Sequence, residues 1–205
     1  MVSLKTQTLN PTPSTLIRKS LIVTVFGSSR PLDGDPEYHT AYDLGRMLAQ
    51  AGHVVCNGGY GGIMEASARG AKEAGGKTIG VLTNTFGRDA NHFIDRKIIK
   101  HSLLERLTAL IELGNAYVVL RGGTGTLVEL ATVWEYLNKQ LMPQKPLVVV
   151  GKFWSPVIAT MKRQLAREGR NDSESCVMIA GSPESCVKML NKRLGSQGTG
   201  TLTAI

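Results

Sequence analysis

The chain has 205 residues and a net charge of +8, with 42% hydrophobic, 20% charged and only 5% aromatic residues. This length and composition suit one globular domain that buries its core without disulfide or metal support. The basic residues are scattered and no RNA-recognition or zinc-finger signature accompanies them, so we expect no nucleic-acid partner and only a mild attraction for small anionic substrates.

The hydropathy and the cysteines argue against a membrane protein, a secreted protein and a protein held together by disulfides or metal. No apolar run approaches the roughly 20 residues that cross a bilayer, and the first residues lack the apolar core of a secretion signal. We therefore expect a cytoplasmic protein with no membrane partner. Cys56, Cys176 and Cys186 form no CxxC pair, so neither a disulfide framework nor a metal site is expected.

The first half of the chain repeats a strand, a turn and a helix. Residues 1–19 are expected to form a loose arm, and the domain is expected to span residues 20–194. The β-branched run at residues 21–26 predicts a buried strand, and Ser28 and Ser29 follow it in a small-residue turn before a helix at residues 38–51. A strand at residues 53–56, a glycine turn at residues 57–64 and a helix at residues 65–74 repeat the plan. Hydroxyls and glycines at strand ends are typical of a ligand crevice, although serines also form turns.

The middle of the chain is less regular. A third strand is predicted at residues 77–82, and residues 83–97 are expected to be irregular and long enough to act as a lid or a subunit contact. Apolar spacing over residues 98–113 predicts a helix that carries Arg106 and ends at Gly114.

A strand at residues 116–120 then leads into a glycine loop and a helix that extends from Leu127 to about Gln140. Unpaired N–H groups and the dipole at such a helix start favour a phosphate. The predicted phosphate-binding residues are Gly122, Gly123, Thr124, Gly125 and Thr126. Glu129 falls about one turn further, where a carboxylate suits chemistry or hydroxyl binding, although the dipole alone also favours an acid there.

The last elements are a strand at residues 147–150, a helix at residues 155–168, a short strand near residues 177–180 and a helix near residues 183–194. Residues 195–205 are expected to be a frayed tail. The alternation of strands and helices predicts a doubly wound, Rossmann-like α/β sandwich with a mostly parallel sheet, whose ligands bind at the carboxyl ends of the strands.

Two segments resemble motifs of one family. The stretch Gly58-Gly59-Tyr60-Gly61-Gly62-Ile63-Met64 and the stretch from Gly122 to Glu129 are similar to the GGGxxGxM and PGGxGTxxE motifs of the LOG (Lonely Guy) family, cytokinin riboside 5′-monophosphate phosphoribohydrolases often labelled lysine decarboxylases. In that family a catalytic arginine precedes the second motif on a helix, and Arg106 has the expected spacing. Arg96 is a competing candidate, ten positions (106 − 96) further away.

The resemblance implies hydrolysis of the N-glycosidic bond of a purine nucleoside 5′-monophosphate, of the AMP or cytokinin type, to a free base and ribose 5-phosphate. It implies catalytic roles for Arg106 and Glu129, with Arg106 keeping Glu129 ionised. The residues that would enclose the sugar and base are Ser28, Ser29, Gly58, Gly59, Gly62 and Met64. It further implies a homodimer and no metal or redox cofactor.

Two residues differ from the motifs of the family, and two other functions were considered. Arg121 replaces the motif's proline, and Asn57 stands at its first glycine. A non-catalytic nucleotide or cofactor binder, such as a molybdenum cofactor carrier, is the alternative, and it would not need the pair of Arg106 and Glu129. A lysine decarboxylase is disfavoured because no lysine has a context suited to a Schiff base.

Overall fold

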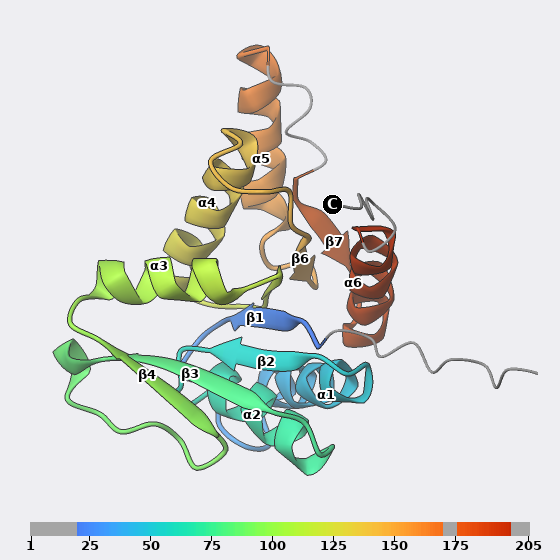
Figure 1. Cartoon of the computed structure of the whole chain (residues 1–205). Coiled ribbons are helices and arrows are strands. Elements are labelled where there is room, and N and C mark those ends of the chain that lie inside the picture. Colours follow the sequence, from blue (N-terminus) through green and yellow to red (C-terminus); the bar gives the residue numbers. More distant parts are fainter. Residues whose placement is uncertain (1–19, 170–175, 198–205) are drawn as a thin grey trace, which may run out of the picture.

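The computed structural model describes residues 20–169 and 176–197. Its seven strands form one parallel sheet in the order β4-β3-β2-β1-β5-β6-β7 (Figure 1). The strands are β1 (Ile22–Phe26), β2 (Val54–Asn57), β3 (Thr78–Thr83), β4 (Arg96–Lys100), β5 (Ala116–Val119), β6 (Leu147–Val150) and β7 (Met178–Ala180). The helices are α1 (Pro36–Gln50), α2 (Ile63–Glu73), the 3₁₀ turn η1 (Asn84–Phe86), α3 (Leu103–Leu113), α4 (Thr124–Asn138), α5 (Ser155–Arg167) and α6 (Pro183–Gln197). The predicted doubly wound α/β fold is confirmed.

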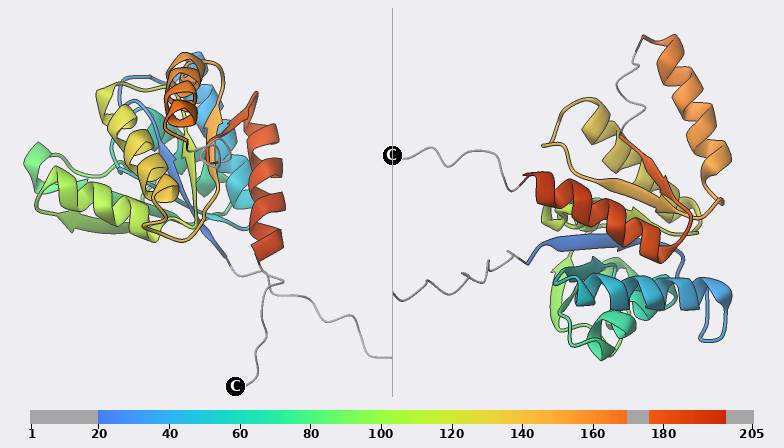
Figure 2. Two further views of the ribbon diagram at one scale, coloured as in Figure 1. Left: turned by 90° about the horizontal axis from the view of Figure 1, so that it is seen from above. Right: turned by 90° about the vertical axis from the view of Figure 1, so that its right-hand side faces the viewer.

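Helices cover both faces of the sheet, as the apolar strand sequences predicted (Figures 1 and 2). Alternate residues of β1 enter different cores: Val23 and Val25 pack with α1, α2 and α6, while Phe26 packs with α3, α4 and α5. Every residue of β5 and β6 is buried. Both layers of helices are therefore needed to remove the sheet from water.

The strand order fixes where a ligand can bind. β1 lies between β2 and β5, so the chain leaves β1 toward one edge of the sheet and later returns to its other side at β5. The loops after β1 and β5 consequently diverge at the carboxyl edge and leave a crevice between them. The Ser28 N–H donates to the Arg121 carbonyl at 3.1 Å, which ties the two loops together at its base.

The prediction for residues 96–102 was wrong. Arg96–Lys100 forms the edge strand β4, paired with β3 in the register Val81↔Ile98, whereas these residues were expected to be irregular or helical. The helix begins later because Ser102 caps it: the Ser102 hydroxyl accepts from the Glu105 N–H at 3.2 Å, and the Glu105 carboxylate accepts from the His101 N–H at 3.1 Å. The sequence Ser-x-x-Glu has the pattern of a capping box, although the carboxylate here bonds the N–H of the residue before the cap.

Other helix boundaries differ as well: α1 and α2 each begin two residues earlier than expected. α4 begins at Thr124 rather than Leu127, so three of the five predicted phosphate-binding residues lie in the first turn of a helix. α6 continues to Gln197, three residues (197 − 194) beyond its expected end. The predicted N-terminal arm and the rest of the predicted tail lie outside the described residues. No helix in the described part of the chain combines the length and the apolar character that spanning a bilayer requires.

Candidate functional site

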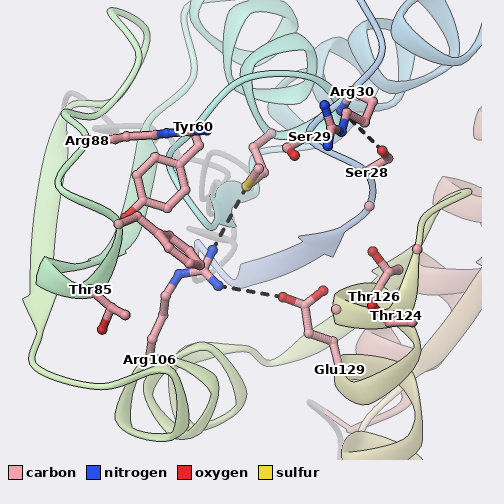
Figure 3. A pocket seen from close by; sticks show the side chains of 15 residues that line it. Ser28, Ser29, Arg30, Tyr60, Thr85, Arg88, Arg106, Thr124, Thr126 and Glu129 are labelled. Carbon is pink, nitrogen blue, oxygen red and sulfur yellow. Dashed lines mark hydrogen bonds and ion pairs between the residues drawn. The ribbon is translucent and has the colours of Figure 1, made fainter.

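A cavity of about 570 Å³ opens at the carboxyl edge of the sheet, within the usual range for small-molecule sites (Figure 3). Its walls come from the loops after β1, β2, β3 and β5 and from α2, α3 and α4. The lining residues are Gly27, Ser28, Ser29, Arg30, Tyr60, Met64, Thr85, Phe86, Arg88, Arg106, Gly123, Thr124, Gly125, Thr126 and Glu129. The strand order therefore gathers most of the predicted site residues around one space.

Arg106 reaches the cavity from α3 and is held in place by its surroundings. Its Nε–H donates to the Val81 carbonyl at 2.7 Å, and its guanidinium carbon lies 5.6 Å from the centre of the Tyr60 ring. Nη2 approaches the Met64 sulfur at 4.0 Å. Because Nε is hydrogen-bonded to the backbone of β3, the two terminal nitrogens are left to face the cavity. The Arg106 side chain is only 12% exposed.

Glu129 faces Arg106 from α4. The Oε1 atom of Glu129 lies 3.9 Å from Nη1 of Arg106, and its side chain is 15% exposed (Figure 3). This separation is longer than a hydrogen bond, so the two groups converge without closing on each other. The structure thus brings together the two predicted catalytic side chains from different helices.

The ionisation of Glu129 differs from the expectation. Burial raises the pKa of Glu129 from 4.5 to about 7, and the Arg106 charge offsets this effect only in part. We expected Arg106 to keep the carboxylate ionised, but desolvation at this site is stronger than the attraction across the gap. Near neutral pH, Glu129 therefore exists in both forms, which suits a group that gives and takes protons.

The start of α4 forms the wall beside Glu129. Its N-cap is Gly123, and no side chain caps the helix. The N–H groups of Thr124, Gly125 and Thr126 have no intrahelical partner at this position, so they and the helix dipole favour an anion in the cavity. Gly122 lines an adjoining pocket instead; a Cβ on it would lie 2.2 Å from Oγ1 of Thr126.

Three predicted glycines shape the cavity without lining it. A Cβ on Gly58 would lie 1.7 Å from Nη2 of Arg106, so this glycine leaves the space that the guanidinium occupies. Gly59 and Gly62 have positive φ angles of 77° and 69°, which glycine adopts readily. Gly62 also packs against the backbone of Ser28 and Ser29, and the adjacent Ile63 N–H donates to the Ser28 carbonyl at 2.9 Å.

Several lining residues were not predicted. Tyr60 belongs to a predicted motif but was given no role, and its hydroxyl both accepts from the Thr83 N–H at 2.9 Å and donates to the Thr83 carbonyl at 3.2 Å. Thr85, Phe86 and Arg88 come from the segment that the sequence marked as a lid or subunit contact. Its irregular composition was the available signal, but which residues face the cavity depends on the path between β3 and β4.

Arg96, the competing candidate for the catalytic arginine, lies away from the cavity. Arg96 opens β4 at its amino end, is exposed, and is absent from the lining of the cavity, which lies at the opposite edge of the sheet. Of these two candidates, Arg106 and not Arg96 is therefore the arginine that lines this site. Within residues 20–169 and 176–197, no group of three or more His, Cys, Asp or Glu side chains is arranged to hold a metal ion.

Comparisons with known proteins identify related chains. The model of the SLOG cluster4 family matches residues 20–187. An uncharacterized protein of Archaeoglobus fulgidus is 37% identical over 114 residues, which cover 55% of this chain and 74% of that one. A cytokinin riboside 5′-monophosphate phosphoribohydrolase of Rhodococcoides fascians is 28% identical over 164 residues, which cover 74% of this chain and 81% of that one.

A solved structure shares the fold. The molybdenum cofactor binding protein of Rippkaea orientalis is 25% identical, with a TM-score of 0.67 over 86% of this chain and 99% of that chain. The relative from Rhodococcoides fascians and the structural neighbour thus carry names of two different functions. The arrangement of Arg106 and Glu129 is the local feature that bears on the choice.

Proposed function

The chain belongs to the SLOG cluster4 family, and on that basis we propose that it hydrolyses the N-glycosidic bond of a purine nucleoside 5′-monophosphate, of the AMP or cytokinin type. The family match confirms the resemblance to the LOG proteins. The observation that carries the proposal is the convergence of Arg106 and Glu129, 3.9 Å apart, in a cavity that is also bordered by the uncapped start of α4.

The phosphate of the substrate binds at the start of α4. The backbone N–H groups of Thr124, Gly125 and Thr126 donate to its oxygens, and the Thr126 hydroxyl adds a donor. This contact fixes the ribose over the floor of the cavity, where Glu129 lies about one and a half turns from the helix start. Binding energy from the phosphate therefore orients the reacting C1′ of the ribose, although the phosphate itself takes no part in the bond cleavage.

Glu129 acts where the glycosidic bond breaks. As the C1′–N bond lengthens, its electron pair moves to the purine and positive charge develops on the sugar, which the ionised carboxylate stabilises. Water adds its oxygen to C1′ and Glu129 accepts the proton that the water loses; the departing base takes up a proton from solvent, and Glu129 returns its own proton to solvent. Arg106 binds ribose hydroxyls or the phosphate with its two terminal nitrogens and restrains the Glu129 carboxylate.

The direct test is the release of free base. Purified protein is incubated with AMP and, separately, with isopentenyladenosine 5′-monophosphate, and adenine or isopentenyladenine is measured by chromatography together with ribose 5-phosphate. Equal amounts of base and ribose 5-phosphate are expected. Adenosine and isopentenyladenosine are the controls, because they lack the group that α4 holds, and we expect them to react far more slowly.

The second candidate is a non-catalytic carrier, favoured by the similarity to the molybdenum cofactor binding protein of Rippkaea orientalis. A carrier needs a cavity and an anion site but has no use for a buried acid opposite an arginine. Binding of AMP with no base release by the unmodified chain would favour the carrier. Base release above that of the Glu129→Gln variant favours the hydrolase.

We also propose that the protein forms a homodimer through its α3 and α4 side. Large apolar residues are exposed on these helices: Leu103 is 50%, Leu104 is 72% and Val128 is 53% exposed. Large apolar side chains left exposed to water are candidates for contact with another protein surface. Both helices carry catalytic side chains on the same layer, so a second copy packed there would lie near the cavity.

The proposal includes a cytoplasmic location, as expected from the sequence. The substrate class is an intracellular metabolite, and the described helices offer no span across a bilayer. Fractionation of cells that express the chain at its natural level tests this location, and recovery in the membrane pellet after a salt wash would contradict it.

A further inference from the structure

We propose that a second pocket beside the candidate site binds a sugar joined to the nucleotide through a second phosphate, so that nucleoside diphosphate sugars are also ligands. This inference rests on the proposed function, because it places the first phosphate at the start of α4. The second pocket, called the outer pocket below, has a volume of about 420 Å³. Among the residues that line it are Arg30, Asp35, Glu37, Arg121, Gly122 and Phe153.

The outer pocket is continuous with the candidate site. Ser28 and Arg30 line both spaces, and the neighbouring glycines at the start of α4 are divided between them: Gly123 lines the candidate site and Gly122 lines the outer pocket. A phosphate at the start of α4 therefore lies at the junction. With the nucleoside over Glu129, a substituent on that phosphate extends away from the catalytic pair and into the outer pocket.

Two arginines border this route. Arg30 stands at the junction itself. Arg121, which replaces the proline of the LOG motif, has its Nη1 atom 2.8 Å from Oε1 of Glu37, and its side chain is still 59% exposed. A guanidinium has five N–H donors, so this contact leaves others for an incoming group. A second phosphate at the junction is thus placed between two permanent positive charges.

The far side of the outer pocket suits a sugar better than a third phosphate. The carboxylates of Asp35 and Glu37 would repel a further anion, but they accept hydrogen bonds from hydroxyl groups. Phe153 is 46% exposed, and Arg121 lies 5.0 Å from the centre of its ring. An aromatic face beside hydroxyl acceptors matches the two aspects of a sugar ring, its C–H face and its hydroxyl edge.

The aromatic wall is firmly supported. The Phe153 and Trp154 rings pack edge to face, with centres 4.9 Å apart. Trp154 is buried, and its Nε1–H donates to the Leu120 carbonyl at 3.0 Å. On the opposite wall, Asp33 anchors the loop after β1 through Arg69 at 2.8 Å. The outer pocket is therefore built on the same loops that shape the candidate site.

The test compares the affinities of AMP, ADP and ADP-glucose by calorimetry, using the full chain with Glu129→Gln so that no ligand is consumed. We expect ADP-glucose to bind about tenfold more tightly than AMP, with ADP between them, because each added group gains contacts of modest strength. Phe153→Ala should bring the ratio of the AMP and ADP-glucose dissociation constants close to one. Leu141→Ala, which removes an apolar side chain that is 67% exposed and lines neither pocket, should leave the ratio unchanged.

Several outcomes would overturn the inference. These are equal or weaker binding of ADP-glucose relative to AMP, ADP binding as tightly as ADP-glucose, a preference that survives Phe153→Ala, or no binding of either nucleotide. If Phe153→Ala does not fold, Arg121→Gln is used in its place, and it too should bring the ratio of the AMP and ADP-glucose dissociation constants close to one. The proposed hydrolysis can fail without the outer pocket. If AMP releases no base but ADP-glucose still binds more tightly than AMP, the reaction is refuted and the sugar-binding role of the outer pocket stands.

Discussion

Nη1 of Arg106 on α3 and Oε1 of Glu129 on α4 lie 3.9 Å apart, with both side chains largely buried. Arg106 is held by the Val81 carbonyl, while burial raises the pKa of Glu129 to about 7. The pair is thus fixed in place but does not close into a tight ion pair. This state leaves hydrogen-bonding capacity on both groups for a ligand in the cavity and keeps the carboxyl ready to exchange a proton near neutral pH.

Replacing Glu129 tests its chemical role. Glu129→Gln keeps the size of the side chain but removes the charge and the proton acceptor, so we expect kcat for base release to fall about 100-fold to 10,000-fold. Calorimetry should show that AMP still binds within a fewfold of the original affinity, because the phosphate contacts at α4 remain. Glu135→Gln, at a half-exposed acid on the same helix, is the matched control and should retain full activity.

The pH dependence of the reaction should report the raised pKa of Glu129. If the ionised carboxylate stabilises the charged sugar, activity is low when Glu129 is protonated and increases with pH to a plateau. The pKa of about 7 places the midpoint of the kcat/KM profile near neutral pH, well above that of an ordinary glutamate. A profile that is flat from about pH 5 to about pH 8 would contradict this assignment.

The same pKa shift predicts a dependence of stability on pH. A carboxyl whose pKa is higher in the folded chain, about 7 against 4.5, binds its proton more tightly when folded. Its contribution to stability is therefore complete below the unfolded pKa and is lost as pH increases through the folded pKa. Between about pH 5.5 and about pH 8 this group lowers the free energy of unfolding by about 2 kcal/mol.

Denaturant unfolding at the two pH values measures this loss. Glu129→Gln does not titrate, so its free energy of unfolding should change less between these conditions than that of the unmodified chain, by about 2 kcal/mol. Glu135→Gln again serves as the control and should behave like the unmodified chain. Identical pH dependence in the unmodified chain and in Glu129→Gln would show that Glu129 has an ordinary pKa.

Much of the fold was readable because its central strands are short, apolar and β-branched. Strand β4 was missed for the opposite reason: the sequence Arg-Lys-Ile-Ile-Lys of Arg96–Lys100 is largely exposed at the edge of the sheet. Charged residues on an edge strand protect it from pairing with other chains, and they also hide the alternation that marks a buried strand. The pairing with β3, rather than local pattern, makes this segment a strand.

The sequence indicated those residues of the candidate site that belong to motifs. It did not indicate those that reach the cavity only through tertiary packing. Glycine loops at strand ends indicated the anion wall, and helical spacing placed Arg106 and Glu129. Arg88 and Phe86 could not be assigned, because they reach the cavity only through the crossover from β3 to β4. The raised pKa of Glu129 was also missed, since it depends on burial by distant segments.

A charge on the exposed side of α3 should prevent the proposed homodimer. Leu104 is 72% exposed, so Leu104→Glu costs little in the monomer but places an unpaired charge in a contact between two copies. Size-exclusion chromatography with light scattering should show a dimer for the unmodified chain and a monomer for Leu104→Glu. Leu141→Glu, at a residue 67% exposed beyond the end of α4, should remain dimeric, and loss of the dimer in both variants would count against this surface.

Gly58 provides a test of the guanidinium position that does not touch a charged residue. A Cβ at Gly58 would lie 1.7 Å from Nη2 of Arg106 and 2.6 Å from the Met64 sulfur, which are the ends of flexible side chains. Gly58→Ala should therefore displace Arg106 and lower kcat/KM for AMP at least about tenfold, because a misplaced group loses much of its effect. The fold can absorb the change, so the free energy of unfolding should decrease by only about 1 kcal/mol.

The matched control is Gly181→Ala, where an added Cβ meets no atom within 4 Å and activity should be unchanged. Because Gly58 makes no contact through a side chain of its own, a loss of activity without a comparable loss of stability assigns the effect to Arg106. Full activity in Gly58→Ala would mean that the guanidinium works equally well from another position, and the role given to its geometry opposite Glu129 would have to be abandoned.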